Sequence, residues 1–171
     1  MSVTIAASRV PTASLLFAAL DRADFHDAYS APLADPSLSP AEIALRVLGA
    51  SPAWVERLMA LRNWTVRRIG LKDVGTMRSG IDRPVRDLEV GDRLGIFQLF
   101  ALTEDEILLG IDDRHLDVRV SVRRSVEMAT PAAYTVSTAV YIKNWLGRLY
   151  MLPVGRIHPL VVRAGMRRAS V

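Results

Sequence analysis

A chain of 171 residues fits one domain, residues 1–171, and its composition, half hydrophobic and 23% charged, excludes a disordered protein. The chain has no cysteine, so disulfides, thiolate metal sites and cysteine nucleophiles are excluded. The formal net charge of +4 is spread along the chain, except for a C-terminal run of Arg163, Arg167 and Arg168 that fits a solvated helix end. Without a basic cluster rich in aromatic residues, we expect no nucleic-acid partner.

The N-terminal segment, residues 1–22, holds a hydrophobic stretch from Thr12 to Leu20. This stretch is about nine residues long and follows Pro11, whereas a membrane span needs roughly 20 residues, and it makes a poor signal peptide. We therefore expect an amphipathic or irregular segment and no membrane partner. The lack of cysteine is compatible with a cytoplasmic protein, which we expect.

The first regular elements are predicted between residues 24 and 49. Residues 24–33 alternate weakly and end at a proline-containing turn, which predicts a short strand. In the following segment Ser39 fits an N-cap, Pro40 the first helical position and Glu42 the third residue of a capping box. A helix is therefore predicted from this point to Gly49, a residue type that ends helices.

A second, longer helix is predicted from Ser51-Pro52 to Gly70, because apolar residues recur there at helical spacing. Residues 71–88 contain glycines and a proline with little periodicity. We expect this part to be a loop, with room for one short strand.

From Arg93 onward the hydrophobic period changes from helical to two, which predicts strands. Thr103-Glu104-Asp105 is typical of a hairpin turn, and later strands carry one apolar and one polar face. We expect an antiparallel meander of at least four strands, over residues 94–102, 106–112, 116–123 and 134–143.

The C-terminal segment, residues 146–168, returns to helical spacing, although Pro153 and Pro159 predict a kink or a break in the helix. An antiparallel sheet with an apolar face needs a cover, and a long amphipathic helix provides one. The predicted class is α+β: a curved antiparallel sheet wrapped around a long C-terminal helix, with two helices inserted after the first strand. A cavity would open between sheet and helix.

Residues 110–122 combine a strand-like pattern with a dense set of ionisable side chains. His115 together with Asp113 or Asp117 has the groups that acid–base catalysis needs, so these three are the candidate catalytic residues. Regular alternation would place Asp112 and Arg114 in the parity of the apolar residues, a conflict that a turn or bulge near Asp113 would resolve. The simpler interpretation is a structural ion-pair network at a strand junction.

Two residues of the second predicted helix, Arg62 and Asn63, are further candidates for ligand binding. A buried arginine requires a carboxylate, because an unpaired buried charge costs several kcal/mol. We expect Arg62 to pair with Asp112, Asp113 or Asp117, in a structural role rather than in substrate recognition.

The three histidines, His26, His115 and His158, lack the close spacing of a helical metal pair, so we expect no metal site and no cofactor. His158 precedes a proline and can cap a turn or donate a core hydrogen bond. Tyr150 is a core anchor or, if a cavity exists, directs its hydroxyl inward. The ligand-binding candidates are Arg62, Asn63, Asp113, His115, Arg119, Tyr150 and His158.

Four stretches together resemble a bacterial family of uncharacterised proteins, domain of unknown function 2867. They are residues 52–63, Gly70-Leu-Lys72, residues 110–119, and residues 144–159 with their Leu-Gly-Arg-Leu-Tyr and His-Pro elements. The resemblance covers about residues 24–168 and implies no established activity. The order of elements is also similar to that of helix-grip domains of the START and polyketide-cyclase type.

The favoured function is the binding of a small apolar or amphipathic organic molecule in a mostly apolar cavity with a few polar anchors. An enzyme of cyclase, isomerase or hydrolase type using His115 is the first alternative. The second alternative is an interaction domain whose polar cluster is purely structural. No Walker loop, G-x-G-x-x-G, G-x-S-x-G or H-E-x-x-H motif is present, and a homodimer stays possible.

Overall fold

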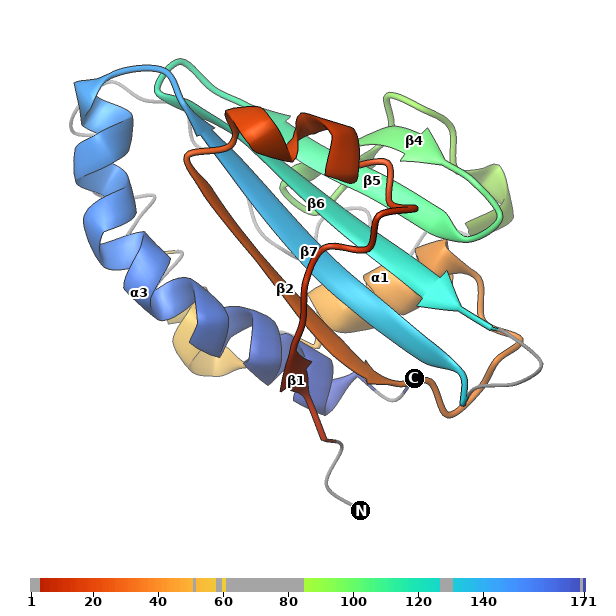
Figure 1. Cartoon of the computed structure of the whole chain (residues 1–171). Coiled ribbons are helices and arrows are strands. Elements are labelled where there is room, and N and C mark those ends of the chain that lie inside the picture. Colours follow the sequence, from red (N-terminus) through yellow and green to blue (C-terminus); the bar gives the residue numbers. More distant parts are fainter. Residues whose placement is uncertain (1–3, 51, 58–59, 61–84, 127–130, 170) are drawn as a thin grey trace.

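In the computed structural model of the chain, residues 4–50, 52–57, 60, 85–126, 131–169 and 171 are described. These residues form one open antiparallel sheet of seven strands in the order β1-β2-β7-β6-β5-β4-β3, with helices on it (Figure 1). The strands are β1 (Ala6–Ala7), β2 (Phe25–Pro32), β3 (Arg93–Leu94), β4 (Phe97–Leu102), β5 (Glu106–Asp112), β6 (Leu116–Ser125) and β7 (Ala133–Ile142). The predicted α+β class, a sheet with a long C-terminal helix, is confirmed.

Helix α1 (Pro40–Gly49) forms where the capping signals predict it. The Ser39 hydroxyl accepts a hydrogen bond from the backbone N–H of Glu42 at 3.3 Å, and the Glu42 carboxylate accepts one from the Ser39 N–H at 2.8 Å. This capping box satisfies two backbone donors that a helix start otherwise leaves open. The reciprocal bonds hold the pKa of Glu42 below its ordinary value.

Only part of the next predicted segment can be compared with the structure. Residues 53–57 are helical, and a short 3-10 helix, η2 (Val85–Asp87), follows later. The remainder of the second predicted helix, and the predicted loop up to residue 84, lie outside the described residues.

The predicted meander is confirmed, since β4, β5, β6 and β7 pair in succession, each antiparallel to the next. A register shift between Leu99 and Ala101 interrupts the pairing of β4 with β5. Strand β2 joins the free edge of β7, with Tyr29 opposite Val136. The strand that comes early in the sequence therefore lies beside the last strand of the meander.

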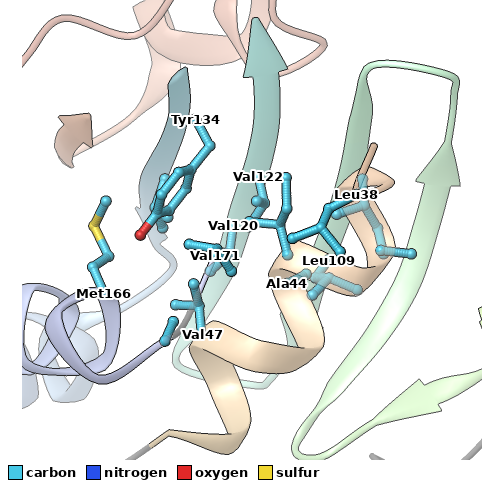
Figure 2. Close-up of a cluster of buried hydrophobic side chains, with 14 of the residues drawn as sticks. Leu38, Ala44, Val47, Leu109, Val120, Val122, Tyr134, Met166 and Val171 are labelled. Atoms are coloured by element: carbon cyan, nitrogen blue, oxygen red, sulfur yellow. The ribbon is translucent and has the colours of Figure 1, made fainter. Parts of the chain in front are cut away.

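One face of the sheet, here called the α face, carries the main core (Figure 2). Val120 and Val122 of β6 contribute to it, as does Tyr134 of β7. Ala44 and Val47 of α1 and Met166 near the chain's end pack in the same cluster. Alternation in the strands thus places one set of side chains beneath the helices, as a half-buried sheet requires.

Helix α3 (Trp145–Arg168) runs through both Pro153 and Pro159 without a break and bends along its length (Figure 1). The kink that the prolines predict is therefore a bend, and the alternative of a broken helix is wrong. Asn144 caps the helix by accepting hydrogen bonds from the N–H groups of Leu146 and Gly147 at 3.1 and 3.2 Å.

The opposite face of the sheet, here called the β face, is covered by the N-terminal segment, which Figure 1 shows on the side away from α1. This segment contains β1 and a 3-10 helix, η1 (Phe17–Arg22), where the sequence predicts an amphipathic or irregular stretch. Val10 and Leu16 form a small second core with Ala28 of β2 and Ala139 of β7. The N-terminal segment thus buries part of the β face.

Glu106 on the β face fastens this N-terminal segment to the sheet. Its carboxylate is 1% exposed and accepts hydrogen bonds from the hydroxyls of Ser14 at 2.6 Å and Ser121 at 2.5 Å. The backbone N–H of Leu15 donates to the other oxygen at 2.9 Å, and the Arg123 guanidinium lies 3.6 Å away. A buried carboxylate needs such a set of donors, because its desolvation is otherwise uncompensated.

Replacing Tyr134 with phenylalanine is expected to raise the free energy of unfolding by about 1 kcal/mol, because a buried hydroxyl without a partner is unfavourable. The Tyr134 side chain is fully buried, and within the described part of the chain its hydroxyl has no hydrogen-bond partner. Urea denaturation near neutral pH measures the difference. Tyr141→Phe is the matched control, since that hydroxyl donates to the Ala19 carbonyl at 3.2 Å and its loss should destabilise the protein.

The same substitution should change the response to alkali. Burial raises the pKa of Tyr134 from 10.0 to about 12, so the folded state keeps the proton that the unfolded state loses first. Ionisation of this tyrosine therefore costs no stability below pH 10.0, and it lowers the free energy of unfolding as the pH rises from 10.0 towards about 12. Tyr134→Phe should remove that part of the alkaline loss, and equal alkaline profiles would contradict this account.

Candidate functional site

The ionisable cluster of residues 110–122 is divided by a turn. Strand β5 ends at Asp112 and β6 begins at Leu116, with Asp112 and Asp117 opposite each other in the register. The turn predicted near Asp113 is therefore confirmed. It reverses the chain between the two halves of the cluster, so closeness in sequence does not bring the charged groups to one place.

The members of the cluster form separate pairs. Arg119 contacts Asp112 at 2.7 Å and lies over the Phe100 ring, with its guanidinium carbon 4.0 Å from the ring centroid. Asp117 forms a salt bridge with Lys143, in which Oδ1 lies 2.6 Å from Nζ. The structural interpretation, an ion-pair network at a strand junction, describes these contacts well.

His115 belongs to a different environment. It is fully buried, and its Nδ1 lies 3.5 Å from an Asp113 oxygen. Its ring forms an edge-to-face contact with the Tyr150 ring of α3, with the two centroids 5.4 Å apart. Its backbone carbonyl accepts a hydrogen bond from the N–H of Lys143 at 3.0 Å. A buried imidazole wedged between a turn and a helix is well placed to hold the start of α3, and its surroundings shield it from solvent.

The candidates Arg62 and Asn63 lie outside the described residues. The expected pairing of Arg62 with one of three carboxylates therefore stays a prediction. Two of those carboxylates, Asp112 and Asp117, have the basic partners named above.

A second polar group lies where α3 crosses β2, and we call it the α3 seam: Asp27, Tyr29, His158 and Arg163. His158 Nδ1 lies 2.9 Å from Asp27 Oδ2, and both side chains are largely buried. The Phe25 and His158 rings form an edge-to-face contact, with their centroids 5.7 Å apart and the two planes at 84°. Asp27 and Phe25 have the same parity in β2, so both belong to the α face.

Tyr29 and Arg163 complete the seam. The Arg163 guanidinium carbon lies 4.8 Å from the centroid of the Tyr29 ring, which is within the range of a cation–π interaction. Burial raises the pKa of Tyr29, the negative charge of Asp27 and a hydrogen bond with the Asp27 carboxylate raise it further, and the positive charge of Arg163 opposes them. The seam therefore places a carboxylate, an imidazole, a phenol and a guanidinium together under one helix.

Two buried polar atoms of the seam, Asp27 Oδ1 and Arg163 Nε, have no hydrogen-bond partner in the described part of the chain. One is an acceptor and the other a donor. Most buried polar groups in proteins are paired, and each exception needs an explanation, such as a bound molecule.

The contact between His158 and Asp27 also sets the proton position on the imidazole. A carboxylate can only accept, so Nδ1 carries the hydrogen, and whenever the ring is neutral Nε2 is the acceptor. Within the described residues no hydrogen bond to Nε2 is found. A histidine oriented in this way by a carboxylate can accept a hydrogen bond or a proton from a bound molecule.

Two of the predicted site residues, Tyr150 and His158, lie eight positions apart on α3, with Val154 midway between them. A spacing of four residues keeps all three on the side of the helix that faces the sheet. The structure thus brings Tyr150 together with His115 at the start of α3, and His158 together with Asp27 further along. It does not bring Arg119 to either place.

Sequence reasoning missed Asp27 and Arg163 as site residues. Asp27 shares the parity of Phe25 and Tyr29 in β2, so a charged residue in the apolar parity was an available signal. Arg163 was interpreted as a solvated cation near a helix end, and nothing local in the sequence indicates its contact with Tyr29. Within the described residues, no group of three His, Asp or Glu side chains is arranged to hold a metal ion.

These features define an α+β protein whose long terminal helix covers a polar seam on an antiparallel sheet. Residues 19–165 match the model of the family described as protein of unknown function (DUF2867), and the chain belongs to this family. No curated protein and no solved structure showed a significant match. Among the described residues, no helix has the length and apolar character that crossing a bilayer requires.

Proposed function

We propose that the chain binds a small amphipathic organic molecule at the α3 seam, with Asp27, His158 and Arg163 as its polar anchors. The observation that carries this proposal is the pair of buried, unpartnered atoms Asp27 Oδ1 and Arg163 Nε in the described part of the chain. A hydroxyl or amide on the ligand would donate to the first atom and accept from the second. Such a ligand would compensate two desolvated groups at once.

The packing of α3 supports an apolar body for the same ligand. In this helix, all of which the structure describes, the fully buried residues are Gly147, Gly165 and Met166, near its two ends. Between them Met151, Val154 and Val162 are only half-buried. Apolar surface beside a few polar anchors is the usual composition of a small-molecule site.

Acid–base catalysis is the second candidate function, and the His158–Asp27 contact favours it at the seam. The imidazole has the orientation and the available Nε2 that a general base requires. The earlier candidate base, His115, is fully buried against Tyr150, and it stays a prediction without a test. A purely structural role for both polar groups is the remaining alternative.

The neutral fluorophore 1-aminoanthracene, which has an apolar ring system and one amino donor, is a suitable probe for the seam. The wild-type chain is expected to bind it with increased fluorescence, because the amino group can donate to Asp27 while the rings contact α3. Asp27→Asn should weaken binding about tenfold by removing a charge-assisted hydrogen bond. Native mass spectrometry of freshly purified protein would reveal a molecule retained from the cell.

Matched variants separate a binding effect from a folding effect. Asp35→Asn changes an exposed carboxylate away from the seam, and His26→Gln changes an exposed histidine for comparison with His158→Gln. Both controls should bind the fluorophore like the wild type, while urea denaturation verifies that every variant is folded. Equal affinities for Asp27→Asn and Asp35→Asn, or no binding by the wild type, would exclude the seam as the binding site.

A further inference from the structure

The outer side of α3 presents large apolar side chains to solvent. Trp145, Leu149, Leu152 and Leu160 are 74%, 56%, 58% and 59% exposed. Their spacings of four, three and eight residues place them along one side of the helix, opposite Tyr150 and His158. We call these four residues the outer stripe. A row of exposed, large apolar side chains along one side of a helix is typical of an interaction surface.

The charges of α3 all have one sign. The helix contains the five arginines Arg148, Arg156, Arg163, Arg167 and Arg168, and no aspartate or glutamate. Arg148 and Arg156 are exposed and alternate with the leucines of the outer stripe. Arg156 donates a hydrogen bond to the Leu152 carbonyl at 2.8 Å, which holds its guanidinium beside the stripe.

We propose that the outer stripe, together with Arg148 and Arg156, docks this protein onto an anionic lipid surface, with α3 lying along the membrane plane. This interaction is separate from the small-molecule binding proposed for the other side of the helix. An amphipathic helix binds such a surface by burying leucines and tryptophan at the headgroup boundary while cations face the acidic lipids. Trp145 at the helix start has the amphipathic ring that favours this boundary.

No helix among the described residues could span a membrane, but a surface contact needs no span, although the sequence alone predicts no membrane partner. Spanning requires about 20 consecutive apolar residues, whereas lying on the surface requires one apolar side and one cationic border. Helix α3 has one apolar side and a cationic border. The sheet lies against the other side of this helix (Figure 1), so the fold is needed to tell which apolar side remains exposed.

Other occupants fit the outer stripe less well. A second copy of α3 would bring further arginines against Arg148 and Arg156 with no carboxylate on either helix to neutralise them. A nucleic acid would use the arginines but leave Leu149, Leu152 and Leu160 without an apolar partner. An anionic bilayer satisfies both the charges and the leucines.

Vesicle flotation with the full-length protein tests the proposal. The protein is expected to float with vesicles of phosphatidylcholine containing about one third phosphatidylserine, and not with pure phosphatidylcholine, because each arginine near the surface adds roughly fivefold in affinity. Raising the salt from about 0.1 M to about 0.5 M should weaken binding at least tenfold by screening. Arg156→Gln should weaken it roughly fivefold.

Each stripe variant has a control elsewhere on the surface. Leu149→Ser combined with Leu152→Ser should weaken flotation at least tenfold, whereas Val90→Ser, at another exposed apolar residue, and Arg93→Gln, at another exposed arginine, should leave it unchanged. All of these positions are exposed, so thermal melts should show intact folding. Equal binding to neutral vesicles, or no binding to either kind, would refute the proposal. Stripe-dependent dimers or stripe-dependent binding of oligonucleotides, without flotation, would assign the surface to another partner and refute it as well.

Discussion

Glu106→Ala is expected to lower the free energy of unfolding by about 4 kcal/mol, because breaking a buried charged network leaves its other members uncompensated. The Glu106 carboxylate is 1% exposed and accepts hydrogen bonds from Ser14, Leu15 and Ser121. Its loss would leave two hydroxyls and one backbone N–H without their acceptor. Arg123 would lose its carboxylate at the same time.

Glu104→Ala is the matched control, since this glutamate lies two positions earlier and its side chain is 91% exposed. Its contact with Arg124 at 3.9 Å lies on the surface, where ion pairs contribute about 0 to 1 kcal/mol. Urea denaturation of both variants measures the contrast. Similar free energies for the two variants would show that the buried network does not contribute to stability.

The same variant should release the N-terminal segment before the sheet unfolds. Ser14 and Leu15 connect this segment to Glu106, while Val10 and Leu16 provide a small apolar contact with the sheet. Limited proteolysis should therefore cut Glu106→Ala faster than Glu104→Ala near residues 12–16. Local opening of this kind follows when few buried contacts hold a segment.

Local signals in the sequence were sufficient for most of the elements. The capping box between Ser39 and Glu42 depends on residues three positions apart, so it predicts the start of α1 without knowledge of the fold. The period-two pattern from residue 93 onward predicts the meander for the same reason, because hairpin neighbours are also sequence neighbours. Such short-range relations are visible in one chain.

The α3 seam could not be predicted because its parts are distant in the sequence. His158 and Asp27 are separated by 131 positions and meet only because β2 pairs with β7 and α3 then crosses β2. No local pattern specifies that β2 joins the free edge of the meander. His158 was named as a candidate for its residue type, while its partner was not.

The ionisable cluster around His115 shows the opposite case. Six charged or titratable residues adjoin one another in the sequence, and the turn after Asp112 sends them to different surroundings. Arg119 contacts Asp112 and the Phe100 ring, whereas the His115 ring contacts Tyr150. Density of ionisable residues along a chain is therefore weak support for a common site. Parity within a strand, which places Asp27 on the apolar side of β2, is the more informative signal.

The first turn of α3 is the second place where a small change should have a large effect. Gly147→Ala is expected to lower the free energy of unfolding by about 3 kcal/mol, although alanine is favoured over glycine in helices by about 1 kcal/mol. A Cβ atom at this position would collide with the His115 carbonyl oxygen and would lie 3.0 Å from the Ile142 side chain. The backbone carbonyl cannot rotate away as a side chain can.

The turn and the helix cannot easily separate to relieve this collision. Lys143 N–H donates to the same His115 carbonyl at 3.0 Å, and the Asn144 amide donates to the Arg114 carbonyl at 3.0 Å. A shift of α3 large enough to admit a methyl group would stretch these bonds and disturb the contact of Tyr150 with His115. The near-ultraviolet circular dichroism of the variant should report that disturbance.

Gly155→Ala isolates the steric cause, because it makes the same change in the same helix. There the nearest atom to an added Cβ is a Phe25 ring carbon at 3.8 Å, an ordinary van der Waals contact. The helix propensity of alanine should then dominate, and the free energy of unfolding should rise by about 0.5 to 1 kcal/mol. Opposite signs for the two variants in urea denaturation would establish that α3 is held against the turn at Gly147, and a stabilised Gly147→Ala variant would contradict that close approach.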